Sequence, residues 1–280
     1  PPPPQPPLPP QGGAGPVAGV APEARWHATL NTIRNLPAAE LALLERVIAD
    51  SFPAARVARL DRDVTPGARS EAVLDRMRAG EIDILVGTQM VAKGHDFPRV
   101  TLVGVLQAEH ALGVQDFRAA ERTFQLLTQV AGRAGRAELP GRVLLQTTYC
   151  DHYAIRAAMF HDYRAFVNDE RRRREKFGWP PFGFLALIRL DGPSQPDVAE
   201  AAGLVARFAR DTAGAAGLEV VVVGPNLAPI ERLRGRTRYV VMLKSGKRNA
   251  LHALVHQLAP QLVFAGDIAV VVDIDPLNLS

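Results

Sequence analysis

The chain has 280 residues, carries 33 lysines and arginines against 29 aspartates and glutamates, and contains a single cysteine. That length is enough for two domains of ordinary size, and one cysteine excludes an internal disulfide and a cysteine-based zinc site. No apolar run reaches the roughly 18 residues of a membrane span, and no segment has the pattern of a secretory signal, so we expect a cytoplasmic protein.

The first 35 residues open with PPPPQPPLPPQGGAGPVAG, which is dense in proline and glycine. Proline cannot donate a backbone hydrogen bond, and glycine loses the most conformational freedom on folding, so such a segment does not sustain a helix or a strand ladder. We therefore expect a disordered tail over residues 1–35, which takes no part in the fold.

Residues 36–150 alternate between helical and strand-like segments. Segment 37–52 places its apolar residues at helical spacing, whereas 82–87 and 100–106 are apolar without alternation, as is typical of strands buried on both faces. Regular interleaving of such strands with helices predicts an α/β domain with a parallel sheet. In chain order we expect helix 37–52, strand 55–60, helix 71–80, strand 82–87, strand 100–106, helix 116–135 and strand 141–148.

The remaining residues, 151–280, show a different pattern. A long helix is followed by segments in the order β-α-β-β-α-β, which is that of the ferredoxin-like fold. We therefore predict a second, α+β domain. Its expected elements are helix 152–178, strand 184–191, helix 197–217, strand 218–224, strand 238–245, helix 247–260 and strand 268–275.

A polar loop, GTQMVAKGHDFP, follows the strand 82–87. Ligand-binding loops of open α/β sheets lie at the carboxyl ends of strands, and the glycines of this loop permit a tight backbone path. Asp96 can accept a hydrogen bond from a ribose hydroxyl or hold an arginine. Three other side chains can donate to phosphate groups, namely Thr88, Gln89 and Lys93. A structural loop with incidental polar residues is the alternative interpretation.

A second motif, QVAGRAGR, ends the helix 116–135. Its alanines and glycines let a ligand approach closely, while Arg133 and Arg136 offer planar charged groups that fit phosphate oxygens. Two arginines in this setting form an arginine-finger arrangement, which stabilises charge on a phosphoryl group during its transfer. A helix end with ordinary solvated arginines is the alternative. We expect both motifs at adjacent strand ends of one sheet.

Two basic segments stand out in the second domain. Residues 171–176 concentrate basic side chains at a helix end. In extended form, the segment IERLRGRTRY would place on one face its arginines Arg232, Arg234, Arg236 and Arg238. Such faces neutralise DNA phosphates without reading sequence. The alternatives are a helix-dipole interaction for the first segment and a solvated strand face for the second. Core packing is preferred over base stacking for Phe177, Trp179 and Phe182.

These motifs resemble those of a known family. The stretches VGTQMVAKGHDFPRVTLVGV and DFRAAERTFQLLTQVAGRAGR, with PPFG, RLRGR and DIDP further on, are similar to the PriA family of replication-restart DNA helicases (primosomal protein N-prime), in helicase superfamily 2. The resemblance covers about residues 53–276. It implies that residues 36–150 are the second RecA-like motor lobe. The loop GTQMVAKGHDFP would then be helicase motif V, and QVAGRAGR would be motif VI. It implies that residues 151–280 are the family's C-terminal DNA-binding domain.

The resemblance also implies roles for individual residues. Thr88 and Gln89 would contact the backbone of single-stranded DNA with Lys93 beside them, and Asp96 would couple that contact to the nucleotide. The residues that would face the ATP phosphates are Gln129, Arg133 and Arg136, the two arginines as the catalytic groups. In the second domain, Arg232, Arg234 and Arg236 are the expected DNA contacts.

The departures from the family pattern concern ATP and metals. No GxxxxGK[ST] phosphate loop and no acidic DExH box occur in the chain, so ATP and Mg²⁺ are expected only if a first motor lobe is supplied. The proline-rich tail stands in place of the family's cysteine-rich zinc module, and we expect no zinc here. The family's Asp-Ala-Asp after the motif V strand is replaced by Gln107, Ala108 and Glu109.

We therefore expect part of a 3′ to 5′ DNA helicase that binds branched DNA at stalled forks and initiates primosome assembly, but no ATPase activity from this chain alone. The expected partners are single-stranded and forked DNA, single-strand-binding protein and primosome proteins, with a nucleoid-associated location. Lys247 and Arg248 would dock an acidic tail of single-strand-binding protein. The alternatives are a non-catalytic fork-binding protein derived from the family and, more weakly, a protein-interaction module.

Overall fold

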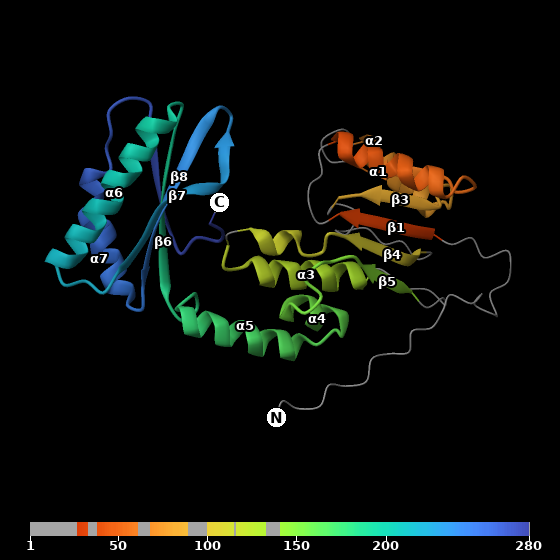
Figure 1. Ribbon diagram of the computed structural model, residues 1–280, viewed down its shortest axis with the longest axis horizontal. Helices are drawn as coiled ribbons and strands as arrows, with labels where there is room; N and C mark the ends of the chain where they lie inside the picture. Colours follow the sequence, from red (N-terminus) through yellow and green to blue (C-terminus); the bar gives the residue numbers. More distant parts are fainter. Residues whose placement is uncertain are drawn as a thin grey trace.

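The computed structural model describes residues 27–32, 38–60, 68–88, 100–114, 116–132 and 141–279. These residues form two sheets, each with its own hydrophobic core, joined by a pair of helices (Figure 1). The predicted combination of a parallel α/β lobe and a ferredoxin-like domain is confirmed. Within the described part, no helix is long and apolar enough to span a membrane.

The first sheet has five strands in the order β2-β3-β1-β4-β5, and every pair of neighbours is parallel. Buried apolar residues on neighbouring strands hold it together, as the non-alternating sequence pattern predicts. The strands are β1 (His27–Thr32), β2 (Val57–Leu60), β3 (Ile84–Gly87), β4 (Val100–Leu106) and β5 (Arg142–Leu145).

Strand β1 corrects the expected domain boundary. Residues 27–32 were assigned to the tail, but they pair with both β3 and β4 and form the middle of the sheet. A six-residue strand after a proline-rich stretch has no helix or turn signal to mark it, and only its long-range pairing identifies it. The prediction that the tail extends to residue 35 was wrong at this end.

Helices cover both faces of the first sheet. Leu74 of α2 and Leu127 of α3 enter the same buried cluster as Ile155 of α4, while α1 buries Leu41 beside β2 and β3. Next to α1, the sheet leaves an apolar groove of about 780 Å³ over β1 and β4. The helices are α1 (Ala38–Ser51), α2 (Ala68–Arg78), α3 (Ala119–Ala131) and α4 (Tyr153–Met159), with the 3-10 helix η2 (His110–Gly113).

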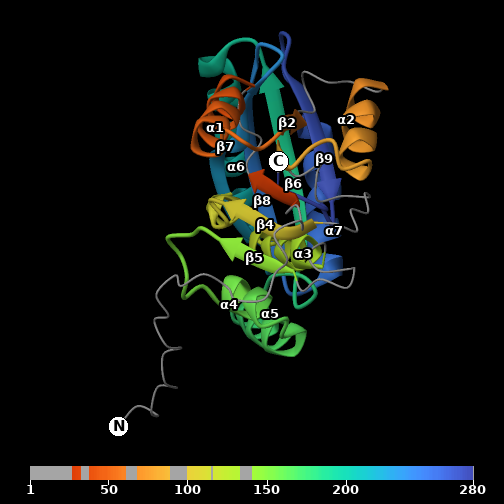
Figure 2. The same ribbon diagram turned by 90° about the vertical axis from the view of Figure 1, so that its right-hand side faces the viewer.

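The second sheet is antiparallel, in the order β7-β8-β6-β9. Helices α6 and α7 pack on one face, with Ile188 and Leu190 of β6 in the core beneath them. The other face turns towards the first domain (Figures 1 and 2). The elements are β6 (Phe184–Gly192), α6 (Gln195–Ala215), β7 (Val221–Leu233), β8 (Arg236–Ser245), α7 (Arg248–Leu258), η3 (Ala259–Gln261) and β9 (Ala269–Ile274).

The helix predicted over residues 152–178 is two helices, α4 and α5 (Tyr163–Phe177). His161 adopts a positive φ of 52°, which a helix cannot contain, and the Asp162 side chain then caps α5 by accepting from the backbone N–H of Ala165 at 2.9 Å. Because the helical spacing of apolar residues continues through this break, periodicity alone did not detect it.

Candidate functional site

The carboxyl ends of the parallel strands meet at one edge of the first sheet. Thr88 directly follows β3 and is only 3% exposed. Gln107 directly follows β4 and adopts a positive φ of 51°, a conformation that a non-glycine residue rarely takes. This edge is where loops of an α/β sheet bind ligands, and the strained backbone lies on it.

Glu109 follows at the same edge and holds a negative charge there. Its carboxylate accepts a hydrogen bond from Thr148 Oγ1 at 3.0 Å, from the loop after β5. Burial opposes ionisation, but hydrogen bonds from the backbone and from Thr147 and Thr148 outweigh it and hold the pKa of Glu109 below its usual value. The second carboxylate oxygen, Oε2, is buried without a hydrogen-bond partner among the described residues.

Most of the predicted motif V loop lies outside the described residues, including Gln89, Lys93 and Asp96. Thr88 is described and lies at the expected edge. The expectation that the two motifs occupy adjacent strand ends needs correction, because β1 separates β3 from β4 in the sheet.

Helix α3 carries the start of the predicted motif VI. Gln129 is exposed on its last turn, and the helix ends at Ala131 with Gly132 as its C-cap. The two candidate finger arginines, Arg133 and Arg136, lie outside the described residues. Contacts that anchor α3 fix the position of Gln129, the described residue of this motif.

Arg174 of α5 is one such anchor. It donates from Nη2 to Glu121 of α3 at 2.7 Å, from Nε to Glu170 at 2.6 Å, and from Nη1 to the carbonyl of Pro180 at 3.3 Å. Its side chain is 14% exposed. The arginine run 171–174 was expected to form a DNA-binding face, but Arg174 points inwards and its charge is used by two carboxylates.

Aromatic stacking adds to this connection between the domains. Phe117, just before α3, stacks on Trp179 with ring centroids 5.5 Å apart, and Lys244 Nζ lies 4.8 Å from the Trp179 ring. The preference for packing over base stacking fits Trp179, whereas Phe177 is 53% exposed.

The arginine-rich segment of the second domain is a β-hairpin. Leu233 pairs with Arg236, so the connection has two residues, Arg234 and Gly235, both with positive φ. Such a turn matches the twist of the flanking strands. Arg232 and Arg234 are exposed, and Arg236 is largely covered.

Arg236 already has partners for its charge. It donates to Asp191 Oδ1 at 2.5 Å, to Asp267 Oδ2 at 2.8 Å, and to the backbone carbonyls of both aspartates. Hydrogen bonding to Asp267 and Asp191 raises the pKa of Arg236. Of the three arginines predicted to bind DNA, it is the one that has carboxylate partners in the described part of the chain.

The four arginines do not share a face. Arg232 pairs with Thr237 across the hairpin and therefore lies on that residue's face, whereas Arg236 and Arg238 lie on the opposite one. The prediction assumed one extended strand and was wrong because the two-residue turn reverses the chain and breaks the alternation.

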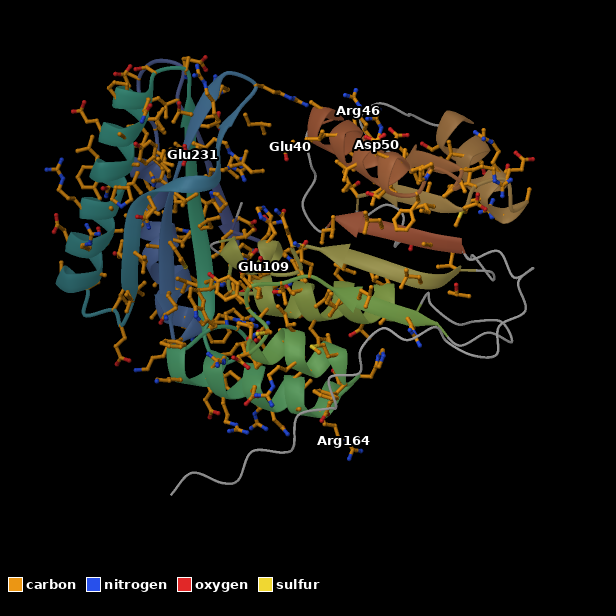
Figure 3. All side chains as sticks on the ribbon, turned by 45° about the vertical axis from the view of Figure 1, so that its right-hand side comes forward. Glu40, Arg46, Asp50, Glu109, Arg164 and Glu231 are labelled. Carbon is orange, nitrogen blue, oxygen red and sulfur yellow. The ribbon has the colours of Figure 1, made fainter. Side chains whose placement is uncertain are left out.

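A groove of about 1060 Å³ lies between the two domains. Glu109, His110, Tyr149 and His152 line it from the first domain, and residues 226–229 and Glu231 of β7 line it from the second. Figure 3 labels Glu109 and Glu231, one on each wall. Two carboxylates make this groove a poor site for a polyanion. In the part of the chain described here, no cluster of three or more metal-ligating side chains occurs.

Sequence comparison finds two family models that match separate parts of the chain. A model of the helicase conserved C-terminal domain matches residues 27–138, and a model of the primosomal protein N C-terminal domain matches residues 175–277. The first match begins at β1, in agreement with the corrected boundary.

Curated relatives match across both domains. The replication restart protein PriA of Bacillus subtilis (strain 168) is 43% identical over 217 residues, which cover 77% of this chain and 26% of that protein. The protein of the same name from Haemophilus influenzae (strain ATCC 51907 / DSM 11121 / KW20 / Rd) is 38% identical over 239 residues, covering 85% of this chain and 32% of the relative. The chain thus spans 26% and 32% of the lengths of these two relatives.

A solved structure, the C-terminal domain of the DEAD-box protein Dbp5, aligns with a TM-score of 0.33 and 16% sequence identity. The alignment covers 55% of this chain and 71% of that one.

Proposed function

We propose that this chain binds single-stranded and forked DNA, and that it forms the second motor lobe and the DNA-binding domain of the replication-restart helicase. The chain belongs to the PriA family, as a C-terminal region of it. The observation that carries the proposal is the pairing, on one chain, of a helicase C-terminal domain with the C-terminal domain of primosomal protein N. Helicase C-terminal domains occur in helicases with many different functions. The match of the second domain to primosomal protein N supports replication restart as the function of this one.

The DNA contacts in this proposal come from both domains. Thr88, Gln89 and Lys93 would meet the backbone of a single strand at the carboxyl edge of the first sheet. Arg232 and Arg234 would add phosphate contacts from the exposed hairpin, and guanidinium groups suit phosphate oxygens. Arg236 would support the hairpin rather than contribute a free charge, since two aspartates neutralise it.

The nucleotide part of the proposal depends on a first motor lobe. Gln129, Arg133 and Arg136 would face the ATP phosphates across a cleft, and Asp96 would link that cleft to the DNA loop. ATP with Mg²⁺ would be held mainly by the phosphate loop and acidic box of the first lobe, because this sequence contains neither. ATP hydrolysis and 3′ to 5′ unwinding are thus proposed only for the assembled helicase.

Partner binding follows from the same proposal. An acidic tail, such as that of single-strand-binding protein, would dock at Lys247 and Arg248, which are 65% and 58% exposed. Lys247 Nζ now lies 2.7 Å from Glu219, and Arg248 lies 3.7 Å from Asp275, so an acidic peptide would replace these surface partners. Contacts with primosome proteins, and a cytoplasmic location at the nucleoid, complete the proposed role.

The test is DNA binding over a salt series. We expect the chain to bind a forked oligonucleotide, and a plot of log K against log salt concentration between about 50 and 200 mM to be linear, with a negative slope of roughly 0.7 to 0.9 per phosphate contact. Fluorescence anisotropy of a labelled fork and of a labelled single strand measures it. A flat plot, or no binding at the lowest salt, would contradict the proposal. Fork binding without any stimulation of a supplied first lobe would favour the non-catalytic alternative.

A further inference from the structure

Two arginines lie close together on the face of the second sheet that α6 and α7 do not cover. Arg189 of β6 pairs with Val240 of β8, and Asp191 pairs with Arg238. Directly opposed residues share a face, as do residues two apart on one strand, so all four lie on the same side. That side is opposite to Ile188 and its neighbours, which face the helices.

Neither arginine has an ion-pair partner among the residues that the structure describes. Arg238 is only 7% exposed, yet its side chain makes no hydrogen bond or ion pair with any residue that the structure describes, and the same holds for Arg189. Asp191, the strand partner of Arg238, accepts a hydrogen bond from Arg236 through Oδ1. Burial of Arg238, and then the like charge of Arg189, lower the pKa of Arg238, and the charge of Asp191 offsets them only in part. A covered positive pair without a partner is unfavourable until an anion binds.

We propose that Arg189 and Arg238 form a phosphate-binding site that takes a phosphodiester group of the DNA backbone on the uncovered face of the four-stranded sheet. This inference rests on the proposed DNA-binding function and gives it a specific site. Guanidinium forks match the geometry of phosphate oxygens, and they position a nucleic acid without reading its sequence. None of the unbonded nitrogens of Arg238 is among the fully buried atoms, so solvent reaches them.

Arg236 has a defined part in this site. It donates to Asp191 Oδ1 and to Asp267 Oδ2, so the carboxylate of the residue paired with Arg238 is shared with Arg236. Arg236 thereby neutralises the local aspartates, and the charges of Arg189 and Arg238 are left to bind a phosphate group. The hairpin arginines Arg232 and Arg234 would then extend the DNA path beyond the sheet.

The experiment compares the double variant Arg189→Gln/Arg238→Gln with the matched control Arg164→Gln/Arg207→Gln in the full chain. Both control arginines are exposed, and Arg164 points away from both domains in Figure 3. We expect the double variant to lower the magnitude of the salt slope for fork binding by about 0.7 to 0.9, the value for one lost phosphate contact, and to lower the affinity by roughly tenfold at low salt. We expect the control to change neither.

Protein stability separates a binding role from a structural one. Because Arg189 faces a like charge, Arg189→Gln alone should leave the melting temperature equal to or above that of the unchanged chain while weakening DNA binding. A lower melting temperature with unchanged DNA affinity would overturn the proposal. This single variant also decides the matter if the double variant does not fold, since Arg189 is less buried than Arg238.

The remaining outcomes distinguish this site from the proposed function. If the unchanged chain binds DNA with a normal salt slope and the double variant matches it, the site is refuted and the function stands. If the unchanged chain does not bind DNA, both fail. An acidic octapeptide serves as a second probe, and we expect it to bind the chain and the double variant equally. Loss of peptide binding with an unchanged DNA slope would assign this face to a protein partner and overturn the proposal.

Discussion

Glu121 of helix α3 and Arg174 of helix α5 form an ion pair with 2.7 Å between the carboxylate oxygen and Nη2, although 53 positions separate them in the sequence. Arg174 also binds Glu170 one turn earlier in its own helix. Helix α3 leads to the candidate nucleotide arginines, and α5 leads into the second domain. The pair therefore ties the start of α3 to the helix that leads into the second domain.

Replacing Arg174 with leucine should destabilise the chain by about 2 to 3 kcal/mol, because Glu170 and Glu121 would lose their shared cation. Urea denaturation followed by circular dichroism measures the change. Arg172→Leu is the control, since Arg172 is 76% exposed and lies 3.8 Å from Asp169. A loss of about 0.5 kcal/mol or less is expected there. Equal losses in the two variants would show that the buried pair adds nothing.

His152 should make stability depend on pH. Its Nδ1 caps α4 by accepting from the N–H of Ala154 at 3.3 Å, and burial, followed by the charge of Arg173, lowers its pKa. With the folded pKa below the unfolded value of about 6.5, protonation favours unfolding. The stabilising contribution is full above that unfolded value and is lost as pH falls below it.

The variant His152→Asn tests this, because asparagine also accepts at a helix N-cap but does not titrate. We expect the melting temperature of the unchanged chain to fall more steeply between about pH 7 and pH 5 than that of the variant. Parallel curves for the two proteins would mean that His152 does not carry the effect.

The isolated chain should hydrolyse ATP no faster than a blank, with or without single-stranded DNA. The sequence has no phosphate loop to hold the triphosphate, so Arg133 and Arg136 have no bound phosphoryl group to stabilise. A phosphate-release assay measures turnover. DNA-stimulated turnover that Arg136→Ala abolishes would overturn this expectation.

The hairpin arginines should separate into two classes. Arg234→Gln should reduce the magnitude of the salt slope for DNA binding by about 1 and leave the melting temperature unchanged, because Arg234 is exposed in the turn. Arg236→Gln should lower the melting temperature, because Asp191 and Asp267 lose their cation. Differential scanning fluorimetry and anisotropy together test this division, and a reversed pattern would refute it.

Much of the fold could be predicted because its signals are local. The unbroken apolar run of β4 and the helical spacing of α3 follow directly from the residues, and the order of elements then predicts a parallel sheet and a ferredoxin-like domain. The break between α4 and α5 was missed because one residue, His161, makes it without changing the apolar spacing.

The candidate site was harder to predict because its charges are paired over long distances. Arg236 meets Asp191 and Asp267, which lie 45 and 31 positions away, and nothing in the segment RLRGR indicates which arginine is neutralised. Arg189 did leave a signal, as the one basic residue in the apolar strand 184–191. The sequence alone does not show that Arg238 lies beside Arg189, because only the strand pairing in the sheet brings them together.

The position of β1 between β3 and β4 has a practical consequence for proteolysis. Removing the chain up to residue 35 would take out the middle strand, separate β3 from β4 and expose an unpaired backbone edge on each. Such a product would expose two apolar strands to other molecules and should aggregate rather than persist as a trimmed domain. Strand β1, a short segment that follows a proline-rich stretch, thus joins the two halves of the first sheet.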